Sequence, residues 1–156
     1  MKNKNNKGFT LIELLIVVLL IGILSGILLG VINVGGIRSK SRDSQRIADL
    51  RRIQVALELY FADNRAYPII MWGEAIDSSS VLGLALEGGG YINKIPLDPK
   101  LSASPRACTA GNYTYSYISN GSTYALMAIM EVSTSNDGFE CTLFCSVENC
   151  YSIENP

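Results

Sequence analysis

The chain of 156 residues is long enough for one domain with a modest hydrophobic core, and 48 % of its residues are apolar. Its net charge of −1 is unevenly spread: residues 34–65 carry seven basic and four acidic side chains, whereas residues 66–156 carry three basic and nine acidic ones. The acidic C-terminal part argues against a head that binds nucleic acid, and the absence of histidine removes the commonest general base, so the composition does not favour an enzyme.

The N-terminal segment from Phe9 to Ile32 contains Glu13 as its only ionisable residue. In a helix this segment extends roughly 36 Å, enough to cross a bilayer core of about 30 Å. A short Lys-bearing tail precedes the segment and ends at Gly8. A secretory signal peptide would have a shorter apolar stretch followed by a small-residue cleavage site. Residues 9–33 are therefore predicted to form a retained transmembrane helix.

The segment opens with the string Lys7-Gly8-Phe9-Thr10-Leu11-Ile12-Glu13-Leu14, and an unbroken apolar helix follows. In these features the chain resembles the type IV pilin and pseudopilin family. The resemblance implies that a membrane peptidase removes the leader, residues 1–8, by cutting between Gly8 and Phe9. It also implies that Phe9 becomes the N-methylated first residue, and that the helix first anchors the subunit and later packs in a filament core.

The same resemblance implies a set of partners: further copies of the chain, the prepilin peptidase, an assembly ATPase, a membrane platform protein and the inner membrane. Basic residues flank the span on both sides, so charge alone does not orient it. The resemblance places the leader in the cytoplasm and the head outside, on a cell-surface pilus or a periplasmic pseudopilus.

Two features of the span are candidates for roles in assembly. A charge among apolar side chains needs a partner, and for Glu13 we expect the α-amine of Phe9 on a neighbouring subunit. Pairing within one helix and simple tolerance at the membrane interface are the alternatives. Gly22, Gly26 and Gly30 recur every four residues on one helix face, a pattern that permits close helix packing, although glycine is common in membrane helices.

A second, amphipathic helix is predicted over residues 34–65. The glycine-containing stretch at residues 33–36 is expected to interrupt the helical structure between the span and this second helix. Asn64 and Pro68 are expected to end the second helix. Apolar residues recur every three or four positions along this helix. Four charged residues are predicted to lie on its more exposed side: Arg46, Asp49, Arg52 and Glu58.

The head is predicted to comprise residues 66–156. Its first part, residues 68–80, is expected to be an irregular connection, after which Ser80 caps a short helix over residues 81–86 that the glycines at 88–90 stop. The two prolines at 96 and 99 predict a rigid extended turn. This Pro-x-Asp-Pro string resembles the segment that precedes the sheet in major pseudopilins.

The strongest strand signals are the alternating β-formers at residues 113–118 and 123–131, which flank Asn120-Gly121 and predict a hairpin. A final strand is predicted over residues 139–145. A long helix followed by a small antiparallel sheet gives an α+β fold, which is the pilin fold that the resemblance implies.

Four cysteines lie in the predicted head, at Cys108, Cys141, Cys145 and Cys150. In an exported domain they predict two disulfides, and a zinc site is the weaker alternative because their spacing is poor for one. The preferred pairing is Cys108–Cys141 with Cys145–Cys150. A strand over residues 141–145 would hold its own two end cysteines roughly 13 Å apart, too far to bridge.

Asp98, Asp137 and Glu140 are candidate calcium ligands by resemblance to the major pseudopilins. The chain lacks a dense run of oxygen ligands, however, and solvated loop carboxylates are the simpler interpretation. No other cofactor is predicted.

The sequence thus predicts a structural filament subunit, of a type IV pilus or of a type II secretion pseudopilus, and not an enzyme. Two alternatives stay open. One is a minor tip subunit whose head adheres to surfaces or captures DNA, and the other is a single-pass anchored binding domain that does not polymerise.

Overall fold

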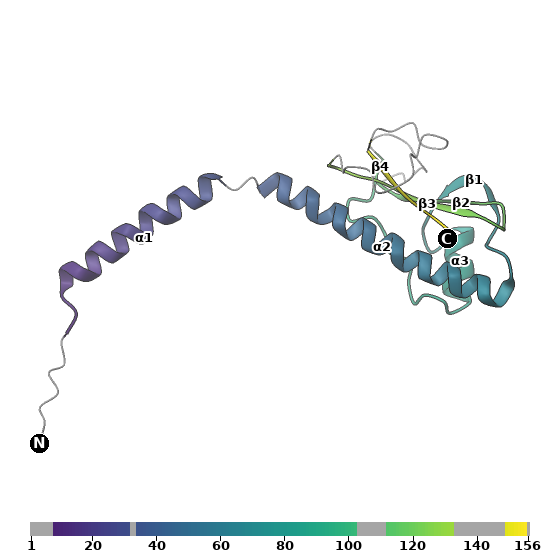
Figure 1. Ribbon diagram of the computed structural model, residues 1–156, viewed down its shortest axis with the longest axis horizontal. Coiled ribbons are helices and arrows are strands. Elements are labelled where there is room, and N and C mark those ends of the chain that lie inside the picture. The colour runs from purple at the N-terminus through teal and green to yellow at the C-terminus, as the bar shows by residue number, and fades with distance from the viewer. Residues whose placement is uncertain (1–7, 32–33, 103–111, 133–148, 156) are drawn as a thin grey trace, which may run out of the picture. The chain divides into compact units, whose positions relative to one another are not determined.

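The computed structural model describes residues 8–31, 34–102, 112–132 and 149–155, without the side chains of residues 27–34. The chain divides into two compact units, residues 1–35 and 36–156. Figure 1 shows the elements in chain order: α1 (Leu11–Val31), α2 (Val34–Asn64), β1 (Ile70–Ala75), α3 (Val81–Gly88), β2 (Tyr115–Ser119), β3 (Tyr124–Ile129) and β4 (Cys150–Glu154).

Helix α1 is apolar on every side. From Leu11 to Leu24 its only other residues are Glu13 and Gly22, and its large apolar side chains are 45 to 81 % exposed. A helix of this kind is found in apolar surroundings, because no face of it suits water. Over the side chains that the structure describes, no helix reaches the length and hydropathy of a membrane span.

Helix α2 begins at Val34, so the interruption predicted at residues 33–36 is wrong for Val34–Gly36, which form the first turn of this helix. The two glycines there weaken the turn without preventing it, at about 1 kcal/mol each relative to alanine. The C-terminal end is at Asn64, as predicted. Arg65 follows with a φ of 60°, a left-handed conformation that terminates many helices.

The sheet has the strand order β1-β2-β3-β4, and all neighbouring strands are antiparallel. The predicted hairpin is confirmed as β2 and β3, which pair from Tyr115↔Ala128 to Ser119↔Tyr124. In the loop between them the Asn120 side chain accepts hydrogen bonds from the N–H groups of Ser122 and Thr123. Gly121 has a φ of 93°. This conformation favours glycine, which explains the Asn-Gly signal.

Two strands differ from the sequence-based expectation. The irregular connection predicted at residues 68–80 contains strand β1, whose apolar alternation is broken by Gly73 and by a register shift between Ile70 and Glu74. The last described strand is β4, which the sequence did not predict. The strand predicted over residues 139–145 lies outside the described residues.

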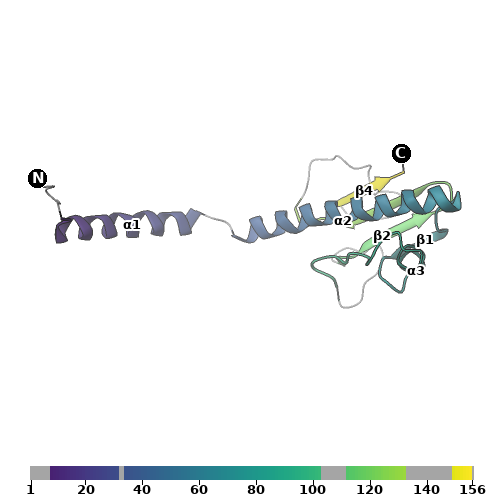
Figure 2. The ribbon, with the colours of Figure 1, turned by 90° about the horizontal axis from the view of Figure 1, so that it is seen from below.

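Helix α2 packs against one face of the sheet, and α3 lies beside the C-terminal half of α2 (Figure 2). The helix α3 begins as predicted, because the Ser80 hydroxyl accepts the N–H of Gly83. The core between the layers is made of completely buried or nearly buried side chains: Leu50, Ile53, Leu57, Leu82, Leu86, Tyr115, Tyr117, Tyr124 and Leu126. Each contributes about 1.5–3 kcal/mol by leaving water. The predicted α+β fold is confirmed.

The buried tyrosines bring carboxylates of α2 into the interface. The hydroxyl of Tyr115 donates to Asp49 at 3.0 Å, and the hydroxyl of Tyr124 donates to Glu58 at 2.8 Å. A buried phenol needs such a partner, since an unpaired hydroxyl costs several kcal/mol in an apolar core. Asp49 is therefore buried, so the more exposed position predicted for it is wrong. Glu58 is half-buried, and Arg52 is exposed as predicted.

Candidate assembly segment and buried ion cluster

The N-terminal end of α1 is closed by a reciprocal cap between Thr10 and Glu13. The Thr10 hydroxyl accepts the N–H of Glu13 at 3.3 Å, and a Glu13 carboxylate oxygen accepts the N–H of Thr10 at 3.0 Å and its hydroxyl at 2.9 Å. This is a capping box, which satisfies two backbone donors that a helix start leaves unpaired. The carboxylate also lies at the positive end of the helix dipole.

The spacing Thr-x-x-Glu ahead of an apolar helix is the sequence signature of a capping box, and the sequence analysis missed it. Glu13 consequently has a local structural role in addition to the predicted intermolecular one. Gly8 and Phe9 precede the helix and are exposed, with Phe9 81 % exposed. The backbone at the predicted cleavage point therefore lies outside the helical hydrogen-bond ladder.

The glycines predicted to pack against other helices are partly described. An added Cβ at Gly22 or at Gly26 would meet nothing within 4 Å, so both positions leave open space on the surface of α1. Gly30 lies where side-chain surroundings are not described. The role of the three glycines in helix packing stays a prediction.

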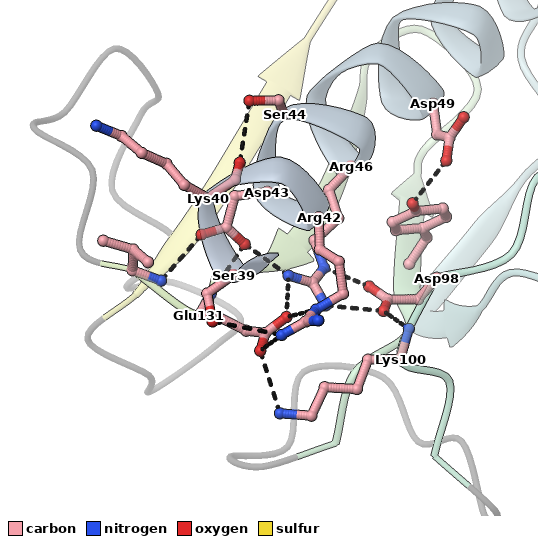
Figure 3. Close-up of polar contacts among 12 residues, drawn as sticks. Ser39, Lys40, Arg42, Asp43, Ser44, Arg46, Asp49, Asp98, Lys100 and Glu131 are labelled. Carbon is pink, nitrogen blue, oxygen red and sulfur yellow. Dashed lines mark hydrogen bonds and ion pairs between the residues drawn. The ribbon is translucent and has the colours of Figure 1, made fainter. Parts of the chain in front are cut away.

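The second site is a cluster of charged side chains that joins the N-terminal half of α2 to the head (Figure 3). Arg46 lies at its centre with no exposed surface. Its guanidinium donates to both oxygens of Asp98, at 2.7 and 2.9 Å, and to Asp43 at 2.5 Å. A fourth contact at 3.1 Å reaches Glu131. The two-pronged contact with Asp98 matches the planar fork of arginine, which lysine does not reproduce.

Glu131 binds the other two cations of the cluster, Arg42 and Lys100. Arg42 donates to both of its carboxylate oxygens at 2.6 Å, and the Lys100 ammonium lies 3.2 Å from one of them. The ring of Tyr113 lies under two of the cations, 4.8 Å from the Arg46 guanidinium carbon and 4.4 Å from the Lys100 nitrogen. Both contacts are within the range of cation–π interactions.

The cluster balances three cations against three carboxylates, those of Asp43, Asp98 and Glu131. Backbone donors complete it, because Asp43 accepts the N–H groups of Glu131 and Val132 at 3.0 and 2.9 Å, and Asp98 accepts that of Lys100 at 2.8 Å. Buried ions are tolerated only when they are paired and hydrogen-bonded in this way.

The charges shift the proton affinities of the cluster. Burial alone would lower the pKa of Arg46, but the hydrogen bonds and charge of Asp98, followed by Asp43 and Glu131, outweigh it and raise the pKa. The hydrogen bonds from Arg42 lower the pKa of Glu131 from 4.5 to about 2 against the opposing effect of burial, with help from Arg46 and Lys100. Arg46 and Glu131 are therefore both charged at neutral pH.

The exposed position predicted for Arg46 is wrong, and the pattern that could have corrected it is present in the sequence. Continuing the apolar stripe backwards from Leu50 in steps of four and three leads to Arg46 and then Asp43. The buried face of α2 thus changes from apolar to charged along one stripe. The Pro-x-Asp-Pro string supplies the partner, since it places Asp98 against Arg46.

Comparison with known proteins supports the prediction from the N-terminal string. The model of the prokaryotic N-terminal methylation motif matches residues 3–29. Type II secretion system core protein G of Aeromonas hydrophila is 30 % identical over 103 residues, which cover 64 % of this chain and 71 % of the relative. The chain belongs to the type IV pilin and pseudopilin family.

Other relatives agree with this assignment. Core protein G of Klebsiella michiganensis is 32 % identical over 103 residues, covering 64 % of this chain and 71 % of the relative, and that of Vibrio cholerae serotype O1 is 33 % identical over 101 residues, covering 63 % and 68 %. No solved structure matches the chain significantly. The pilin and pseudopilin family is structural rather than enzymatic, consistent with a site made of caps and ion pairs.

Within this pseudopilin-like head, the predicted calcium ligands are only partly described. Both carboxylate oxygens of Asp98 are occupied by Arg46, so Asp98 is committed to the ion cluster. Asp137 and Glu140 lie outside the described residues. The calcium site stays a prediction that the geometry of Asp98 does not favour.

The cysteine framework of the pseudopilin-like head is likewise described at one position. Cys150 begins β4 and is disulfide-bonded. Cys108, Cys141 and Cys145 lie outside the described residues, so the predicted connectivity stays open. Cys150 is the first residue of the edge strand β4, which pairs with β3 from Ala125↔Glu154 to Ile129↔Cys150.

Proposed function

We propose that the chain is a structural subunit of a type II secretion pseudopilus, and that it polymerises through its N-terminal helix after the leader is removed. One observation carries the proposal: a methylation-motif match at residues 3–29 and similarity to core protein G occur together in one chain.

Leader removal is the first step of the proposed function. The prepilin peptidase cuts between Gly8 and Phe9, and Phe9 is then methylated. Both residues are exposed and precede α1, so the scissile bond is reachable without unwinding the helix. The cap between Thr10 and Glu13 keeps the helix start closed on the C-terminal side of the cut.

Membrane insertion and assembly follow. Residues 9–33 anchor the subunit in the inner membrane with the head in the periplasm, and an assembly ATPase and a platform protein drive its entry into the pseudopilus. The charged groups in the filament core are then the Phe9 amine and the Glu13 carboxylate. An unpaired charge in low dielectric is costly, so a neighbouring subunit's amine is a strongly favoured partner for Glu13.

The substitution Glu13→Gln tests polymerisation with the helix cap preserved, because glutamine also fits the capping-box position. We expect the Glu13→Gln subunit to insert and to be cut, but to enter filaments poorly when it is expressed together with unaltered subunits. Quantitative mass spectrometry of sheared filaments measures the ratio of the two forms.

The substitution Thr10→Ala is the matched control, since it weakens the cap and retains the carboxylate. It should enter filaments more readily than Glu13→Gln. Equal incorporation of Glu13→Gln and unaltered subunits would contradict the proposed charge pairing.

A further inference from the structure

Strand β1 and the residue before it carry an apolar ridge, made of Ile69, Met71 and Trp72, that the described residues leave uncovered. Trp72 is 87 % exposed, Met71 is 65 % exposed and Ile69 is 61 % exposed. The ridge lies at an edge of the sheet, since the strand order is β1-β2-β3-β4 (Figure 1). Three large, exposed apolar side chains within four positions of an edge strand are a candidate surface for binding a partner.

The backbone of β1 presents this ridge through a bulge. Ile70 pairs with Ser119 and Glu74 pairs with Tyr117, so β1 advances four residues where β2 advances two. The extra residues are those around Trp72, and bulges at sheet edges commonly re-aim side chains in this way. Glu74 in β1 and Asp77 shortly after it accept hydrogen bonds from the N–H groups of Val81 and Ser80 at the start of α3, so the C-terminal end of β1 is acidic.

A groove with basic side chains lies between α2 and residues 92–96 and has a volume of about 760 Å³. Its apolar lining includes Val55, which is 61 % exposed. Three cations also line it: Arg51, Arg52 and Lys94. Arg52 lies 3.6 Å from Asp49, whereas Arg51 and Lys94 form no ion pair within the part of the chain that the structure describes. The groove is therefore apolar and basic.

We infer that the ridge of one copy of the chain docks in the groove of a second copy, with the Trp72 indole against Arg51. The inference deepens the proposed function and rests on it, because a filament supplies the second copy. Acidic and basic surroundings attract each other, and an arginine over an indole face adds a cation–π contact. Trp and Arg are also the residues most enriched at the energetic centres of protein interfaces.

The two surfaces share no residue, so each copy can offer its ridge to one neighbour and its groove to another. A contact between two different surfaces does not close into a symmetric dimer and instead extends into a ring or a helical array. This contact would fix the heads along the filament, in addition to the packing of α1.

Photo-crosslinking in filaments tests the inference with the full chain. A photoreactive benzoylphenylalanine replaces Trp72 in a subunit that is expressed together with unaltered subunits, and sheared filaments are irradiated and mapped by mass spectrometry. We expect cross-links from position 72 to residues 44–55 or 92–96 of another copy. The same probe at Leu84, which is 63 % exposed on α3, should give no cross-link to that groove.

Two substitutions measure the energetic weight of the contact. Trp72→Ala and Arg51→Glu should each lower incorporation into mixed filaments by about tenfold or more, as expected for the centre of an interface. The controls Leu84→Ala and Arg65→Glu alter exposed residues outside both surfaces and should leave incorporation unchanged.

Filaments in which the probe at position 72 reacts with lipid, with another protein or with a different part of the chain would overturn the inference while leaving the proposed function intact. Failure of the unaltered chain to form filaments would contradict the proposed function, and the inference would fall with it.

Discussion

Replacing Arg46 should strongly destabilise the head. In Arg46→Met the methionine fills part of the volume of the arginine stem but leaves Asp98, with no exposed side-chain surface, and Asp43, with 4 %, without their central cation. Breaking a buried ion pair by removing one partner costs about 3–5 kcal/mol, because a desolvated charge stays behind. For a domain of this size that loss lowers Tm by roughly 10–20 °C.

The matched control is Arg52→Met, which removes the same chemical group from the same helix. The Arg52 side chain is 72 % exposed and lies 3.6 Å from Asp49, so the change should cost no more than about 1 kcal/mol. The Tm of each variant is measured by melting the full chain in a mild detergent, with the near-ultraviolet circular dichroism of the buried tyrosines as the signal.

A double-mutant cycle with Asp98→Asn separates the pair from the rest of the cluster. Asparagine keeps an acceptor for the Lys100 N–H and removes the charge that Arg46 neutralises. The double variant Arg46→Met/Asp98→Asn should therefore be more stable than the sum of the two single losses predicts. The reasoning is refuted if Arg46→Met melts within about 3 °C of Arg52→Met.

Three further predictions follow from the same structure. The pKa of Glu131 is lowered from 4.5 to about 2, so the ionised carboxylate contributes to the free energy of unfolding of the head. This contribution, up to about 3 kcal/mol, is complete above about pH 5 and is lost as the pH falls towards 2. Acid titration of the head should show this loss, and a Glu131→Gln variant with an equally steep titration would contradict the assignment. Intact mass of filament subunits should show a chain that begins at methylated Phe9, and Gly8→Leu should leave the longer precursor in the membrane; filaments built of uncut chains would argue against the cleavage site. Reduction should destabilise the head by about 2–5 kcal/mol per bridge, and thiol counting by mass spectrometry should find no free cysteine in the exported protein before reduction; a free Cys150 thiol would be inconsistent with the disulfide.

The sequence by itself determined the features that depend on neighbouring residues. The long apolar run defined α1, the spacing of Leu50, Ile53 and Leu57 defined the buried face of α2, and Asn120-Gly121 defined the hairpin. Such signals are readable because helix faces, caps and tight turns are set within a few positions along the chain. The capping box of Thr10 and Glu13 was equally readable, and missing it was an error of interpretation.

The tertiary structure decided the features that join distant segments. The stripe of α2 indicates that Arg46 faces the core, but Asp98 is 52 positions away, and no local pattern shows that it is the partner of Arg46. Strand β1 is irregular by its own sequence and becomes a strand because β2 offers it hydrogen-bonding partners. The physical reason is the same in both cases: burial of a charge and pairing of a bulged strand are favourable only after the sheet has docked on α2 and supplied the partners.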